Sequence, residues 1–138
     1  MSKKLLTIFS LLLIFFAMSC NNKSTDSKGP DYTDPIDPPA SRPLKDSQYV
    51  GKWYEENSNG IVCEIKQDGS IDLLDGTGVL VSASGTDVIK ERDAVFKAVF
   101  SANGNTAEIV FTFTSAATGS MLLDNVPPPD NIITIVKK

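Results

Sequence analysis

Apolar and polar residues alternate along most of the chain after residue 46. Short runs rich in β-branched and aromatic residues are separated by turn-forming residues every 8–12 positions or so, roughly the spacing of antiparallel strands. The pattern predicts an all-β domain: a small antiparallel meander with one apolar face that closes into a small β-barrel or a tightly curled sheet, and closure would remove the exposed strand edges. The expected strands are 49–56, 61–66, 70–74, 78–82, 86–90, 94–101, 106–114, 119–123 and 131–136.

The clearest hairpin surrounds Asn103-Gly104. A two-residue turn of this composition predicts type I′ geometry, in which both central residues need positive φ. A helix over 94–101 is the alternative, but it would discard the cross-strand register of the hairpin. That register puts eight inward residues opposite one another: Phe100 and Ala107, Ala98 and Ile109, Phe96 and Phe111, Ala94 and Phe113.

A second turn lies at Lys66–Ser70. A two-residue loop there would place apolar residues opposite charged ones, whereas a three-residue loop with left-handed Gly69 keeps the faces separate. Cys63 then points inward, where we expect a buried thiol that packs as a small hydrophobe. The expected pairs are Ile65 with Ile71 and Cys63 with Leu73.

The N-terminus has the layout of a secretory signal, with Lys3 and Lys4 before the apolar run 5–17 and the small residue Ser19. A membrane-spanning helix needs about 20 apolar residues, and this run is shorter. A buried core helix is the other alternative, but nothing amphipathic follows. We therefore expect residues 1–19 to be a cleaved signal peptide.

The segment Ala17-Met18-Ser19-Cys20 resembles the lipobox of bacterial lipoproteins. The resemblance implies that Cys20 becomes the first mature residue and carries acyl chains, which would anchor the protein in the outer membrane. The periplasmic face and the cell surface both remain open. The alternatives are ordinary secretion with a free Cys20 thiol, or a disulfide between Cys20 and Cys63.

Residues 20–45 hold five of the eight prolines and little that could be buried. This composition predicts a disordered, partly extended tether. Residues 46–138 are enough for one modest core, so we expect a single folded domain.

Charge and composition exclude several functions. The net charge is −4, and it falls to −6 when Lys3 and Lys4 leave with the signal peptide, so nucleic acid is not an expected partner. Histidine is absent, and Asp68, Asp72 and Asp75 lack the spacing of a calcium loop. We expect solvated carboxylates, with Asp72 on the outward face beside Glu64. No catalytic residue, metal site or cofactor is predicted, and an enzyme working through carboxylates is the minor alternative.

Gly51 and Trp53 form a Gly-x-Trp motif in the first strand. With segments 64–74 and 132–138, it resembles the short lipocalin-like domains of Gram-negative lipoproteins. The resemblance implies a barrel that Trp53 plugs at one end. The chain departs from the pattern because no arginine lies near the final strand, where Lys137 and Lys138 are the nearest cations. We expect four inward phenylalanines to fill much of the barrel: Phe96, Phe100, Phe111 and Phe113.

The first functional hypothesis is a lipid-anchored envelope lipoprotein whose barrel binds a small apolar ligand. The alternative is a protein-interaction module, such as a protease inhibitor or an accessory subunit of an envelope complex. The candidate interaction loop is Val126, Pro127, Pro128 and Pro129, in which prolines leave the sheet and stiffen the backbone. The same loop would also serve as a rigid linker into the last strand.

Overall fold

The computed structural model describes residues 41–138, which form one all-β domain. Each of the nine strands lies within a residue or two of a range predicted from the pattern. The predicted signal peptide, Cys20 and most of the predicted tether lie outside the described residues. The elements are β1 (Gly51–Glu55), β2 (Ile61–Ile65), β3 (Ile71–Asp75), β4 (Gly78–Ala83), the 3-10 turn η1 (Gly85–Asp87), β5 (Val88–Arg92), β6 (Val95–Ala102), β7 (Asn105–Phe113), β8 (Thr118–Leu123) and β9 (Ile132–Lys137).

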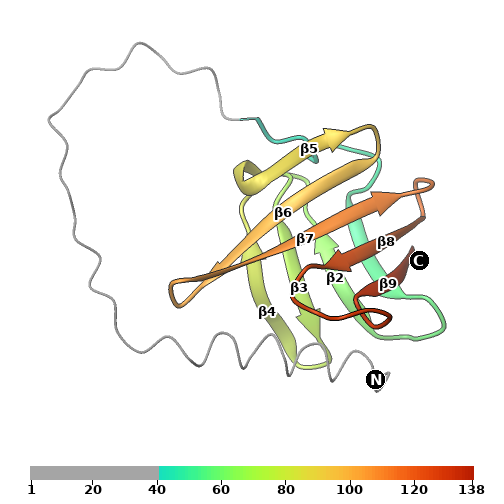
Figure 1. Cartoon of the computed structure of the whole chain (residues 1–138). Coiled ribbons are helices and arrows are strands. Elements are labelled where there is room, and N and C mark those ends of the chain that lie inside the picture. Colours follow the sequence, from blue (N-terminus) through green and yellow to red (C-terminus); the bar gives the residue numbers. More distant parts are fainter. Residues whose placement is uncertain (1–40) are drawn as a thin grey trace, which may run out of the picture.

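The strands form a single sheet in the order β4-β3-β2-β1-β9-β8-β7-β6-β5. Every pair of neighbours is antiparallel, and the first strand pairs with the last, so the sheet curls into a nearly closed barrel (Figure 1). The barrel remains open between β4 and β5. The predicted all-β, barrel-shaped meander is confirmed, but β4 and β5 keep free edges, so closure does not remove every edge.

The number of strands explains why the barrel remains open between β4 and β5. In an antiparallel series of nine strands, the first and the ninth run in the same direction, so β4 and β5 could pair only as parallel strands. A parallel pair needs a crossover of about a dozen residues or more, and the link here is the short segment 84–87. The edge strand β5 instead exposes Lys90, Glu91 and Arg92, and such charges discourage pairing with other chains.

The two predicted hairpin turns are confirmed. Asn103 and Gly104 have φ values of 52° and 80°, as a type I′ turn requires. The register of β6 and β7 matches the prediction for three pairs, and Ala94, just outside β6, accepts a hydrogen bond from Phe113 N at 2.8 Å. In the β2–β3 turn Gly69 has a φ of 87°, and Cys63 pairs with Leu73.

Strand β5 begins two residues later than predicted. Residues 85–87 form the turn η1 instead, and the Ser84 hydroxyl accepts a hydrogen bond from Thr86 N. Because β4 and β5 are not paired, no strand hydrogen bonds hold the connection between them, and the turn η1 forms that connection instead.

Residues 42–50 fold over one end of the barrel, which we call the entry end. Asp46 N donates to Gln67 O at 3.0 Å, and Leu44 is fully buried in the core. A Cβ at Gly69 would lie 2.9 Å from Lys45 N, so only glycine allows this approach. Although the sequence placed Leu44 in the tether, it belongs to the folded domain.

The opposite end, which we call the loop end, carries the connections 56–60, 76–77, 103–104 and 124–131, low in the view of Figure 1. Between the two ends, all nine strands contribute buried apolar side chains to one continuous core. The predicted burial of the inward phenylalanines is confirmed, since none is more than 4% exposed: Phe96, Phe100, Phe111 and Phe113.

We expect Leu44→Ala to lower the free energy of unfolding by about 2–5 kcal/mol, because it would leave a cavity under the cover of the entry end. Urea unfolding followed by circular dichroism measures the change. Val79→Ala is the matched control: Val79 is 55% exposed and should contribute little. Equal effects of the two substitutions would show that the entry segment does not stabilise the barrel.

Candidate functional site

Trp53 is fully buried at the entry end of the barrel. Its indole Nε1 donates a hydrogen bond to Tyr49 O at 2.9 Å, which satisfies the only polar atom of the side chain. The ring centroid lies 5.0 Å from that of Phe113, and the Tyr49 ring stacks on Phe113 at 4.0 Å. Packed rings therefore occupy this end of the interior.

Lys137 covers the indole from the final strand. The two residues are partners in the β1–β9 ladder, and the Lys137 ammonium lies 5.8 Å from the Trp53 ring centroid. The same ammonium donates to Gln48 O at 2.7 Å and Val50 O at 3.3 Å. A lysine thus joins the last strand to the entry segment. The sequence alone identified Lys137 only as one of the two cations nearest the final strand, without its role over the indole.

Gly51 makes room for this lysine. Its φ is 136°, and a Cβ there would lie 3.1 Å from Lys137 Cδ. The glycine of the Gly-x-Trp motif is therefore needed both for its backbone conformation and for the space it leaves.

Cys63 is a free, fully buried thiol, as predicted from its register. Burial raises its pKa far above the usual range, because the thiolate would lose its hydration. The thiol stays neutral and is a core residue rather than a nucleophile.

Two of the predicted surface carboxylates stabilise turns. Asp68 accepts hydrogen bonds from Ser70 N and Oγ at 3.0 and 2.6 Å, and Asp75 accepts from Thr77 N and Oγ1 at 2.7 and 2.6 Å. These bonds lower the pKa of both carboxyl groups.

Asp72 differs from its prediction. It lies on the outward face beside Glu64, but it is only 5% exposed and is not a solvated charge. Its carboxylate accepts a hydrogen bond from Ser82 Oγ at 2.6 Å and forms an ion pair with Lys66 Nζ at 2.7 Å. The hydrogen bond to Asp72 is the main cause of a raised Lys66 pKa. Asp72 on β3 is therefore a structural link, joined to Lys66 just after β2 and to Ser82 on β4.

Neither a metal-binding cluster nor a membrane-spanning helix lies among the described residues. No three acidic or cysteine side chains between residues 41 and 138 converge to hold a metal ion. One buried polar atom in this part of the chain, Glu55 Oε2, lacks a hydrogen-bond partner. Over the same residues, no helix has the length and apolar character to cross a membrane.

The predicted interaction loop projects at the loop end. Val126 is buried and anchors the loop, while Pro127, Pro128 and Pro129 are all exposed. Leu123 N donates to Asn131 O at 2.9 Å, which ties the two ends of the loop together. The prolines thus form a fixed apolar projection beside the barrel.

Ile132, at the start of β9 three residues after Pro129, is a second exposed apolar side chain near this loop, and sequence reasoning missed it. It is 59% exposed, the highest value among the large apolar side chains of the described residues. The signal was its outward position in the period-two pattern of the last strand.

The comparisons with known proteins are negative. No family model, no curated protein and no solved structure matches the chain. The functional argument therefore depends on the residues themselves.

We expect Lys137→Met to lower the free energy of unfolding by about 1–2 kcal/mol, because it removes the contact with the Trp53 ring and two hydrogen bonds to the entry segment. Urea unfolding followed by tryptophan fluorescence reports both stability and the indole environment. Lys138→Met is the control: Lys138 makes contacts of the same kinds, over the Tyr54 ring and to Ser58 O, but none with Trp53 or the entry segment. A loss as large for Lys138→Met would contradict this role of Lys137.

We expect the Cys63 thiol to react with Ellman's reagent at pH 8 only when the chain is unfolded. Because its pKa is raised in the folded state, the domain should lose stability as pH rises above about 8.5, where the thiol of the unfolded chain ionises. Urea midpoints at pH 7 and pH 10 measure this loss. Cys63→Ala, although less stable at both pH values, should lose less between them. An equal loss in both proteins would assign the pH dependence to other groups.

Proposed function

We propose that the protein is a lipid-anchored lipoprotein of the cell envelope whose barrel binds another protein. The support for the anchor is the lipobox-like segment that ends at Cys20, together with the apolar run before it. In this proposal the acyl chains on Cys20 hold the protein in the outer membrane, and the acidic domain contributes no membrane affinity of its own.

The observation that carries the binding proposal is the exposed apolar projection Pro127–Pro129, followed three residues later by the exposed Ile132. Apolar side chains that remain in water on a fixed backbone are typical of interaction sites. Their conformation is already set by proline rings and by the hydrogen bond between the loop ends, so little entropy is lost on binding.

A small apolar ligand inside the barrel is the other form of the proposal. No specific observation favours it, because the inward positions of every strand carry apolar side chains that pack in one core. At the entry end the rings of Tyr49, Trp53 and Phe113 occupy the interior.

The positions of the tether and the proline loop would let an anchored domain present the loop to a partner. The tether joins the domain at the entry end, where Leu44 is locked into the core, and the proline loop lies at the opposite end (Figure 1). An anchored domain would therefore carry the loop on the side away from its attachment.

The test is chemical cross-linking and capture from the native envelope. Replacing Pro127–Pro129 by Gly-Ser-Gly should abolish a cross-linked species while the urea midpoint of the domain changes little. Replacing the turn residue pair Gly76-Thr77 at the same end by Asn-Ser is the control and should leave the species intact. Retention of the cross-linked species in the loop variant would reject this loop as the binding element.

A further inference from the structure

An apolar row runs across the outward face of the sheet next to the proline loop. Val110 on β7 pairs with Leu122 on β8, and Leu122 pairs with Ile132 on β9. At about 4.8 Å between strands, the row spans about 10 Å. Ile132 follows Pro129 after Asp130 and Asn131, so the row begins three residues after the exposed prolines, at the same end of the barrel.

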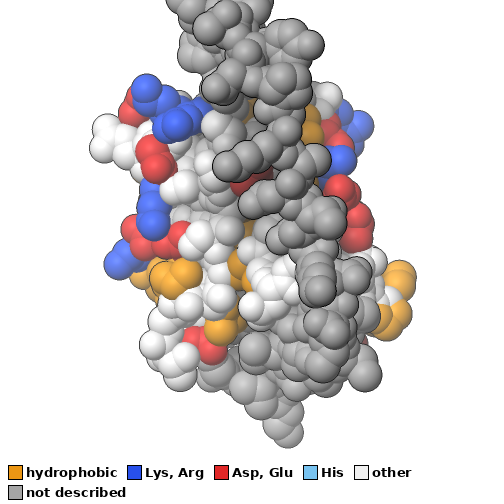
Figure 2. Space-filling model, turned by 90° about the vertical axis from the view of Figure 1, so that its left-hand side faces the viewer, with side chains coloured by type: hydrophobic (Ala, Val, Ile, Leu, Met, Phe, Trp, Pro, Cys, Tyr) orange, Lys and Arg blue, Asp and Glu red, His pale blue; other side chains and the backbone are white. Residues whose placement is uncertain are grey.

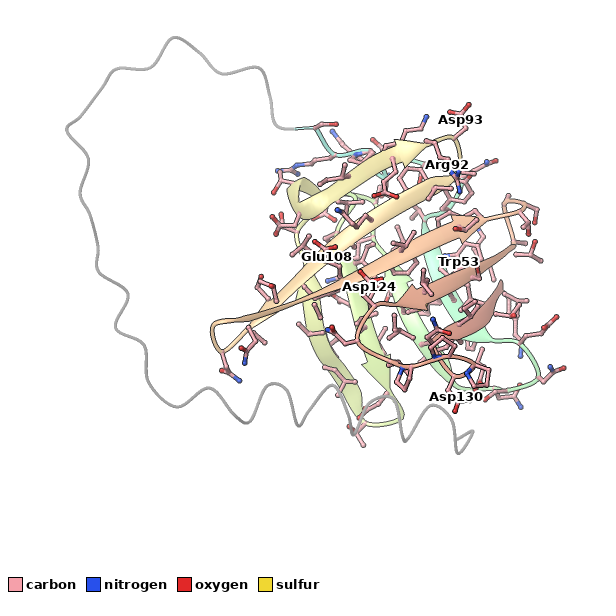
Figure 3. The ribbon with its side chains drawn as sticks, in the orientation of Figure 1. Trp53, Arg92, Asp93, Glu108, Asp124 and Asp130 are labelled. Carbon is pink, nitrogen blue, oxygen red and sulfur yellow. The ribbon has the colours of Figure 1, made fainter. Side chains whose placement is uncertain are left out.

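Two carboxylates border this surface. Asp124 follows the last residue of β8, and the Ile109–Leu123 pair places it beside Glu108 of β7. Both are exposed, and both project from the same face of the sheet in Figure 3. Like charges on neighbouring strands repel each other, and a cation brought by a partner would relieve that repulsion.

These carboxylates are only partly neutralised within the domain. Lys97 Nζ lies 3.7 Å from Glu108 Oε2, but it also lies 3.9 Å from Glu91 Oε1. Asp124 forms no ion pair with any residue between 41 and 138. The charge of this region is therefore negative and available to a partner.

Charge is also segregated along the barrel. The four connections of the loop end contain no lysine or arginine. Between residues 41 and 138, the ammonium group that bonds to these connections is that of Lys138, which donates to Ser58 O and Asn59 Oδ1, each at 3.1 Å. Where grey atoms do not cover the face in Figure 2, Lys and Arg side chains lie in its upper and middle parts.

We propose that the surface formed by Pro127–Pro129, Ile132 and Leu122 binds a basic protein segment. Apolar side chains of the partner pack on the prolines and the apolar row, and its lysine or arginine groups pair with Asp124 and Glu108. The inference rests on the proposed function, and it names the charge of the partner. A second copy of this chain would bring the same carboxylates and be repelled.

The test uses the ¹⁵N-labelled mature chain, residues 20–138 with Cys20→Ser, titrated with three synthetic hexapeptides. The first is Lys-Arg-Leu-Leu-Arg-Lys, and the others replace its four cations by glutamine or by acidic residues. We expect amide shifts from Leu122 to Ile132 with the basic peptide only, and weaker binding at higher ionic strength.

Asp124→Asn with Glu108→Gln should weaken this binding about fivefold or more, as the loss of two exposed charge pairs allows. Asp87→Asn with Asp93→Asn removes the same charge elsewhere and is the matched control. Amide shifts spread over all acidic residues, or unchanged binding by the first variant, would overturn the inference.

These outcomes are separable from those of the proposed function. If the Pro127–Pro129 variant loses its cross-linked envelope protein while the Asp124 and Glu108 variant keeps it, the loop binds a protein but the partner is not selected by basic charge. If the Pro127–Pro129 variant also keeps that protein, both proposals fail.

Discussion

The pairing of β1 with β9 is the constraint on which the rest of the structure depends. It joins strands that are about eighty residues apart in the chain, so it must offset the entropy of closing a long loop. The ladder bonds are reinforced where Trp53 and Lys137 lie opposite each other, and Lys137 also holds the carbonyl groups of the entry segment. The same pairing fixes the directions of all nine strands and hence leaves β4 and β5 unable to join.

Most of the fold could be predicted because its signals are local. The turns at Asn103-Gly104 and at Gly69 need positive φ, and each turn sets the register of the strands beside it. With the register known, the period-two pattern gives the inward side chains, including Cys63 and the four phenylalanines. These inferences compare residues only a few positions apart.

The parts that could not be predicted depend on distant contacts. Leu44 has a tether-like neighbourhood in the sequence, and its burial arises only because the entry segment meets the Gly69 turn. Asp72 lies on an outward face, yet Lys66 and Ser82 enclose it from two sides. Of the candidate interaction surface, the prolines were visible in the sequence. Leu122, Ile132 and Asp124 join them only through cross-strand register.

The positions of Leu44 and the proline loop have a mechanical consequence. If the chain before β1 is anchored and the loop holds a partner, as proposed, tension would pull on the start of β1 at the entry end and on the start of β9 at the loop end. These two starts lie at opposite ends of neighbouring antiparallel strands, so the load would act in shear along the β1–β9 ladder. In shear the ladder hydrogen bonds share the load and must break together, whereas peeling breaks them one after another. The geometry that presents the loop would therefore also let the domain hold a partner against force.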